Sequence, residues 1–278
     1  MQKFTFTKWL LLAALPILLT SCFEQQEEVV TQEINNTAGI EIYKPSHIEG
    51  EFAVNGTKIH YRAKADPNDL TEVQLAFQVG DKNIESIINY NTEYLLLDGH
   101  DQVLTQDEKD GLIAAALEVG DYINQAANAE EANVLHPEYA LVRMMQYLGN
   151  APTNHVFKKL EFAGLDAPEA RHGNEGITCV KKGRTVRAEY DKGTNGQRYN
   201  EAVRVNSKPR SGYGCMGRCG ADCGRWWIPS SWTKDCMDHD QCSNVFRASG
   251  GSGDSNCGDE FNEAADDWAL GVARGCWG

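Results

Sequence analysis

Positive charge is scarce in this sequence. Its 278 residues include 26 lysines and arginines against 40 aspartates and glutamates, which gives a formal net charge of −14. Such a chain repels the phosphates of nucleic acids and gains no electrostatic attraction to anionic lipid surfaces. We therefore expect no nucleic-acid partner. Any approach to a phospholipid membrane has to rely on a lipid anchor or on apolar contacts.

The apolar run near the start of the chain is too short to cross a bilayer, which takes about 20 apolar residues. It extends from Trp9 to Leu19 behind two lysines, a pattern typical of an export signal. It closes on the residues LTSC, which end at Cys22 and resemble a bacterial lipobox. The resemblance implies a signal peptide over residues 1–21, lipidation of Cys22, and a protein exported to a bacterial outer membrane or cell surface. An ordinary secretory signal is the alternative.

Cysteine is missing from the whole stretch between Cys22 and Cys179. The eight that follow are even in number, and in an exported chain this predicts a disulfide framework whose connectivity the sequence does not determine. A zinc site is the alternative for four of them, but an oxidising compartment and the lack of CxxC pairs favour disulfides. The predicted disulfide cysteines are Cys179, Cys215, Cys219, Cys223, Cys236, Cys242, Cys257 and Cys276, and the four candidate zinc ligands are Cys215, Cys219, Cys223 and Cys236.

Two changes in composition divide the rest of the chain. Residues 22–40 are polar and acidic with few large apolar side chains, which predicts a lipidated, disordered tether. The disulfide cysteines begin only after a loop-like stretch near residue 170. We therefore predict an α+β domain over residues 41–170, in which no motif carries chemistry, and a disulfide-stapled, mainly helical domain over residues 171–278.

Strand patterns precede helical patterns in the first domain. The dipeptide NG at 55–56 separates two alternating runs and predicts a hairpin, because both turn positions favour positive φ. Thr105 and Glu108 predict a capping box at the start of a helix. A second helix is expected over residues 137–149, between a proline and a glycine.

The second domain is expected to hold a hairpin and two helices. Alternating runs on either side of the loop at 192–197 predict the hairpin. One helix is expected to begin near Trp232, and another over residues 257–270. The acidic residues of the latter are expected to form, in part, a solvated face; they are Asp259, Glu260, Glu263, Asp266 and Asp267.

The heptapeptide CMDHDQC places His239 and Asp240 between Cys236 and Cys242. Helical spacings of three and four residues put the two cysteines and the His-Asp pair on neighbouring faces. Disulfides to other segments would therefore fix the helix and limit where the pair can point. Residues 100–101 form a second His-Asp pair without cysteines nearby, which we interpret as solvated loop residues.

A loop rich in glycine and cysteine, SGYGCMGRCGADCG, precedes this helix at residues 211–224. Glycines permit positive φ and allow backbone carbonyls to approach one another. Calcium takes six to eight oxygen ligands, and backbone carbonyls suit it. The loop together with one carboxylate therefore indicates a calcium site. A stapled surface loop that binds nothing is the alternative.

The loop motif YGC…CG and the helix motif CxxHDxC together resemble secreted phospholipase A2. The resemblance covers roughly the last quarter of the chain and implies a phospholipase A2-like domain there. It implies calcium-dependent hydrolysis of the sn-2 acyl ester of phospholipids, with a phospholipid membrane as partner. His239 would be the general base, Asp240 a calcium ligand and the Gly220 N–H part of the oxyanion hole. The carbonyls of Arg218, Gly220 and Asp222 would complete the calcium shell.

The sequence departs from the family pattern in two places. The loop reads CMGRCGADCG where the family has CxCGxGG, and Asp235 stands where members often have a second cysteine. The acid that orients the histidine in this family is expected on the last helix. Asp259 fits that place, and Asp266 and Glu263 are alternatives.

Two other functions stay open at this point. A non-catalytic domain of the same fold would bind calcium, lipid or a protein partner. A structural envelope lipoprotein would be held by its disulfides and have no site. Calcium binding would exclude the second of these, and ester hydrolysis would exclude the first.

Overall fold

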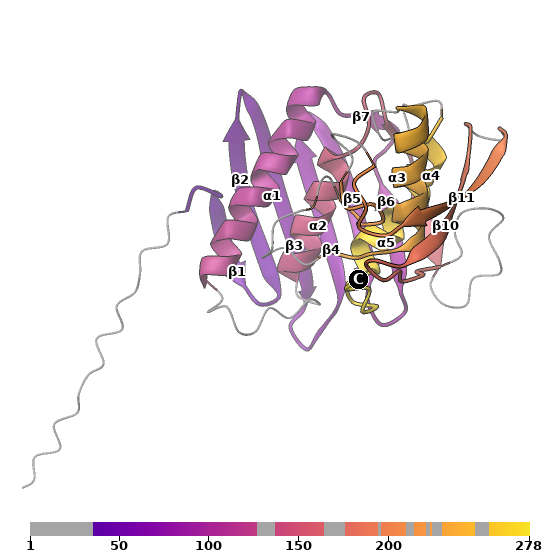
Figure 1. Ribbon diagram of the computed structural model, residues 1–278. Helices are drawn as coiled ribbons and strands as arrows, with labels where there is room; N and C mark the ends of the chain where they lie inside the picture. The colour runs from indigo at the N-terminus through magenta and orange to yellow at the C-terminus, as the bar shows by residue number, and fades with distance from the viewer. Residues whose placement is uncertain are drawn as a thin grey trace, which may run out of the picture. The chain divides into compact units, whose positions relative to one another are not determined.

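The protein is described by a computed structural model in which residues 34–278 make up one compact unit (Figure 1). The expected signal peptide, Cys22, most of the tether and Asp222 lie outside the described residues. The predicted division near residue 170 stays a prediction. No helix in the described ranges is long and apolar enough to span a membrane. Those ranges are 36–126, 137–163, 176–193, 196–209, 214–220, 223, 230–247 and 256–278.

A seven-stranded antiparallel sheet in the order β1-β2-β3-β4-β5-β6-β9 forms one layer. The hairpin predicted at 55–56 is confirmed, because Asn55 (φ 50°) and Gly56 (φ 82°) join β2 to β3. The second half of β4 alternates buried and more exposed residues, as in a sheet with one covered face. The strands are β1 (Ile40–Lys44), β2 (His47–Val54), β3 (Thr57–Asp66), β4 (Asp69–Val79), β5 (Lys82–Asn89), β6 (Tyr94–Asp98) and β9 (Leu160–Ala163).

Two helices, α1 (Gln106–Ala126) and α2 (Pro137–Gly149), cover one face of this sheet (Figure 1). The capping box at the start of α1 is confirmed. The backbone N–H of Thr105 donates to Glu108 Oε2 at 2.7 Å, and the Glu108 N–H donates to Thr105 Oγ1 at 3.3 Å. The short strands β7 (Gln102–Val103) and β8 (Val156–Phe157) pair beside the main sheet. Residues 100–101 precede β7 and are exposed, as expected.

The C-terminal part is not clearly mainly helical, which corrects the expectation for it. The predicted hairpin is present as β10 (Thr185–Asp191) and β11 (Arg198–Arg204), and it accompanies three helices. The chain as a whole is α+β, as predicted. The expected solvated acidic face is also absent, since none of the five acids between Asp259 and Asp267 is exposed. The helices are α3 (Lys234–Phe246), α4 (Gly258–Glu263) and α5 (Ala265–Leu270).

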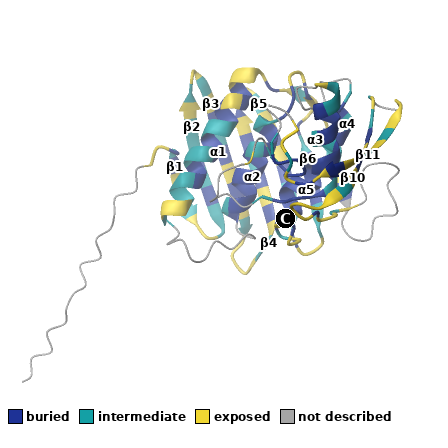
Figure 2. Cartoon of the chain, in the orientation of Figure 1, coloured by how far each residue is buried: buried dark blue, intermediate teal, exposed yellow. Residues whose placement is uncertain are grey.

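The apolar core under the sheet continues into the C-terminal helices. Tyr147 of α2 stacks on Phe261 of α4 with ring centroids 4.7 Å apart, and it meets Trp268 of α5 edge-on at 5.8 Å. A smaller core lies between the β10–β11 hairpin and α3, around Tyr190 and Met237. Figure 2 shows α3 as largely buried. The helix that carries the His-Asp pair is therefore enclosed, and only part of it reaches the surface.

All eight predicted cysteines form disulfides, which rules out the zinc alternative for four of them. The connectivity fixes α3 through both of its cysteines, as expected from their spacing. Cys236 binds the glycine loop, and Cys242 binds the residue before α4. The disulfides are Cys179–Cys276, Cys215–Cys223, Cys219–Cys236 and Cys242–Cys257.

The longest disulfide loop should contribute most to stability. Cys179 and Cys276 are 97 residues apart, whereas Cys215 and Cys223 are 8 apart. Loop-closure entropy then predicts that replacing the first pair by serine lowers the free energy of unfolding by roughly 2 kcal/mol more than replacing the second. Urea unfolding of the two double variants measures this difference. Equal losses would show that native-state packing, and not loop closure, dominates.

Candidate functional site

The His-Asp pair is held by the first two turns of α3. Thr233 is the N-cap residue and donates its backbone N–H to the Gly217 carbonyl at 3.0 Å. The next residue, Lys234, donates its backbone N–H to Thr178 at 2.9 Å. With the Cys219–Cys236 disulfide, these bonds fix the start of the helix before the pair begins.

The glycine loop lies against α3 because two of its residues have unusual backbone angles. Gly217 has φ 86°, and a Cβ there would lie 2.8 Å from the Met237 side chain. Gly220 has φ 131°, so an L side chain at either position would be strained. These two glycines therefore permit the close approach of loop and helix.

Hydrogen bonds set the direction of the loop carbonyls. Arg218 forms an antiparallel bridge with Trp232, in which the carbonyl of Gly217 accepts from Thr233 and the N–H of Cys219 donates to Ser231. In such a bridge the backbone C=O and N–H groups of the two flanking residues face the partner strand. The carbonyl of Arg218 itself therefore points to the opposite side.

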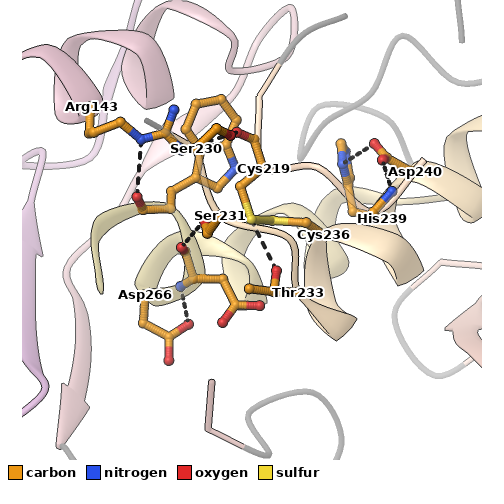
Figure 3. Close-up of a disulfide and its surroundings, with 12 residues drawn as sticks. Arg143, Cys219, Ser230, Ser231, Thr233, Cys236, His239, Asp240 and Asp266 are labelled. Atoms are coloured by element: carbon orange, nitrogen blue, oxygen red, sulfur yellow. Dashed lines mark hydrogen bonds and ion pairs between the residues drawn. A yellow bond between two sulfur atoms is a disulfide. The ribbon is translucent and has the colours of Figure 1, made fainter. Parts of the chain in front are cut away.

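His239 and Asp240 lie beside this loop (Figure 3). The N–H of Gly217 donates to Asp240 Oδ2 at 2.7 Å. Nδ1 of His239 lies 4.0 Å from Oδ1 of Asp240, beyond direct hydrogen-bond range. The His239 ring meets Phe261 edge-on with centroids 5.6 Å apart. The side chains keep exposures of 17 % and 24 %, so both reach solvent.

The carboxyl of Asp240 is easier to protonate than an ordinary aspartate. Burial raises its pKa to about 8, while the Gly217 amide and the guanidinium charge of Arg218 oppose that rise. A cation placed beside this carboxyl would favour its ionised form. The site is therefore suited to a positive charge, and Arg218 supplies part of one.

The candidates for the acid that orients His239 lie on α4 and α5. Asp259 is half-buried in α4, and its Oδ1 accepts no hydrogen bond from the described residues. Asp266 is buried in α5, where its Oδ1 accepts the N–H of Asp267 at 2.9 Å. Which of these acids, or Glu263, orients His239 stays a prediction.

Sequence reasoning missed Arg143, a buried residue of α2 with an exposure of 1 %. It donates to the Cys219 carbonyl at 3.0 Å and to the Trp268 carbonyl at 3.3 Å. Its guanidinium also lies 4.7 Å from the ring centroid of Trp268. Figure 3 shows Arg143 on one side of the Cys219–Cys236 disulfide and the His-Asp pair on the other.

The sequence held one signal for Arg143. A single arginine interrupts the otherwise apolar run ALVRMM in a helix with a strong apolar face. A buried arginine needs acceptors, but only the folded chain shows that these acceptors are carbonyls of the glycine loop and α5.

Comparison with known proteins finds a family model for the C-terminal part of the chain. Residues 175–278 match a family model described as a domain of unknown function (DUF8213). No curated protein and no solved structure matches the chain. The matched range includes the glycine loop, α3 and all eight disulfide cysteines. The description of this family names no activity, so the function of the site has to be argued from its residues.

Removing the guanidinium of Arg143 should loosen the glycine loop. Arg143→Met leaves two buried carbonyls without their donor, so we expect it to lower the free energy of unfolding by about 2–5 kcal/mol. Urea unfolding measures this. Arg187→Met is the matched control, because Arg187 binds Asn200 at the exposed surface of the hairpin, and a change below about 0.5 kcal/mol is expected. Equal losses of unfolding free energy in the two variants would show that Arg143 does not hold the glycine loop.

The raised pKa of Asp240 predicts a pH dependence of stability. Its folded-state pKa of about 8 exceeds the unfolded value, so folding is favoured by the protonated form. In chelator, this contribution is present below about pH 4 and is lost as pH rises toward about 8. Thermal melting across this range should show a shallower decline for Asp240→Asn than for the parent or for Asp101→Asn. Parallel curves for all three would contradict the assignment.

Proposed function

We propose that this protein hydrolyses the sn-2 acyl ester of phospholipids in a calcium-dependent reaction, with His239 as general base and Asp240 as calcium ligand. One observation carries the proposal: the Cys219–Cys236 disulfide and the Gly217–Asp240 hydrogen bond hold a glycine loop against a His-Asp pair. The partly exposed side chains of His239 and Asp240 thus lie next to the backbone of the glycine loop.

The described residues offer oxygen ligands of the kind that calcium binds. Asp240 offers Oδ1, since Oδ2 already accepts the Gly217 amide. The Arg218 carbonyl points away from the bridge to Trp232. The Gly220 carbonyl and that of Asp222, which is outside the described residues, would supply further oxygens. Calcium prefers such oxygen ligands. When bound, the ion would act as a Lewis acid toward the ester carbonyl.

The distance between His239 and Asp240 supports the role of His239 as general base. The 4.0 Å between its Nδ1 and Asp240 Oδ1 is a separation that one bridging water spans. His239 would accept a proton from that water as the water oxygen attacks the ester carbonyl carbon. It would then return the proton to the leaving glycerol oxygen, which yields a free fatty acid and a lysophospholipid.

The backbone N–H of Gly220 would stabilise the negative oxygen that forms during attack. Its φ of 131° is a conformation that glycine adopts readily and other residues do not. Oxyanion donors of this kind have to be fixed before the reaction. The disulfide at the neighbouring Cys219 and the Arg143 hydrogen bond to the Cys219 carbonyl provide that rigidity.

The remaining parts of the proposal concern the envelope. We infer that the C-terminal part is a phospholipase A2-like domain, that Cys22 is lipidated, and that the protein is anchored at a bacterial outer membrane or cell surface. Two or more acyl chains hold a protein stably at a membrane. The anchor would therefore keep His239 near its substrate without help from the acidic surface.

A structural envelope lipoprotein without a calcium site is the second candidate, and Arg218 favours it. The charge of its guanidinium acts on the Asp240 carboxyl. A guanidinium that stays at the carboxylate would compete with calcium, in which case the loop would be a structural feature and not a calcium site.

Hydrolysis assays separate these functions. The full chain should release fatty acid from mixed phospholipid vesicles with calcium and not with chelator. His239→Gln should lower the rate by about 10²–10⁴-fold while calcium affinity stays nearly unchanged. Asp240→Asn should sharply weaken calcium binding at the glycine loop. The second His-Asp pair provides matched controls, and His100→Gln and Asp101→Asn should leave both readouts unchanged.

Two results would reject this assignment. Release that is equal in wild type and His239→Gln would remove the histidine as base. Calcium binding without release would favour a non-catalytic binding module.

A further inference from the structure

Three buried aspartates meet next to the Cys219–Cys236 disulfide, and we call Asp235, Asp266 and Asp267 the aspartate cluster. Asp235 belongs to the first turn of α3, and the other two to the first turn of α5. One carboxylate oxygen from each lies within 4.8 Å of the others. Their exposures are only 4 %, 4 % and 0 %, so water solvates them poorly.

Buried carboxylates this close together repel one another. Burial raises the pKa of Asp266 to about 7. Burial, followed by the charges of neighbouring acids, raises the pKa values of Asp235 and Asp267 well above the ordinary value. In the described part of the chain, no lysine, arginine or histidine forms an ion pair with any of the three. The nearby Lys234 is engaged with Asp238 at 2.6 Å.

The oxygens of Asp267 provide independent evidence for a ligand. Asp267 is fully buried, yet neither of its carboxylate oxygens accepts a hydrogen bond from a residue that the structure describes, and the same holds for Oδ2 of Asp235. The Thr233 hydroxyl and the Asp235 backbone face Asp267 closely enough to favour its ionised form. Neither donor reaches good hydrogen-bond geometry with it. Buried charges are normally paired or coordinate a metal.

We propose that the aspartate cluster binds a hard divalent cation such as Ca²⁺, which links the start of α3 to α5. Two oxygens on one calcium ion are at most about 4.6–5.2 Å apart, and the three carboxylate oxygens of the cluster all lie within 4.8 Å of one another. The Thr233 hydroxyl is a further oxygen nearby. Cys219 and Cys236 also lie close to Asp267 but are joined in a disulfide, so no thiolate is available for a softer metal.

This site differs from the one proposed around Asp240. In Figure 3, Asp266 and Asp240 lie on opposite sides of the Cys219–Cys236 disulfide. The cation would hold α5, whose Trp268 carbonyl accepts from Arg143, against the start of α3. Its role would be structural, and no step of the proposed hydrolysis depends on it.

Calcium titration of the chelator-treated full chain tests the cluster. The Asp240→Asn background removes the contribution of the other site. In it we expect one bound ion per chain and a rise in melting temperature of about 5 °C or more at a calcium concentration 100 times the dissociation constant. Adding Asp267→Asn, which keeps the side-chain shape, should abolish both effects. Adding Asp101→Asn, in an exposed loop, should abolish neither.

Three results would overturn the proposal. Asp240→Asn could bind no calcium, or Asp240→Asn/Asp267→Asn could still bind it. Alternatively, adding Asp267→Asn could raise the melting temperature although the Asp240→Asn variant binds no ion. That result would show that the carboxyl groups of the cluster share protons and do not hold a cation.

If Asp240→Asn fails to fold, terbium luminescence of the wild type, excited through tryptophan, is measured in place of the calcium titration. The emission should then fall in Asp267→Asn, and unchanged emission would reject the site. Calcium bound at the cluster without hydrolysis by the wild type would reject only the proposed function.

Discussion

The Cys219–Cys236 disulfide is the constraint on which the site depends. It joins the glycine loop to the first turn of α3, three residues before His239. On one side of this bond the Gly217 amide reaches Asp240, and on the other side Asp235 meets the acids of α5. Free loops rich in glycine have high conformational entropy. The covalent link therefore holds in one conformation the backbone groups that the proposed reaction requires.

The sheet and its two helices take part in this arrangement through Arg143. Its guanidinium is buried among carbonyls and aromatic rings, and burial lowers its pKa while Tyr139 and Tyr90 oppose the change. Removing a charged group from water is costly unless it gains hydrogen bonds. Arg143 gains them from Cys219 and Trp268, which belong to the loop and to α5. The N-terminal elements thus support the loop, and their apolar core continues into α4 and α5.

Much of the fold was predictable because its elements follow local rules. The turn at 55–56, the capping box at Thr105 and both hairpins depend on neighbouring residues only, and an even number of cysteines in an exported chain predicts disulfides. The aspartate cluster was not predictable. The sequence predicted a solvated face for part of the acids in this segment. In the folded chain Asp266 and Asp267 are buried where α5 meets α3. The partners of Arg143 and the disulfide connectivity likewise follow from contacts distant in sequence. For the candidate site, the sequence indicated the glycine loop and the His-Asp pair, but not that the Gly217 N–H donates to Asp240 or that the charge of Arg218 acts on that carboxyl.

Anomalous diffraction from crystals grown with calcium would show whether the ion binds at the glycine loop. We expect an anomalous peak about 2.3–2.6 Å from an Asp240 carboxylate oxygen and from the carbonyls of Arg218 and Gly220, beside Nδ1 of His239. The Arg218 guanidinium should then point away from the ion. A map without a peak at this place, with that guanidinium bound to the Asp240 carboxylate instead, would contradict calcium-dependent catalysis at this site.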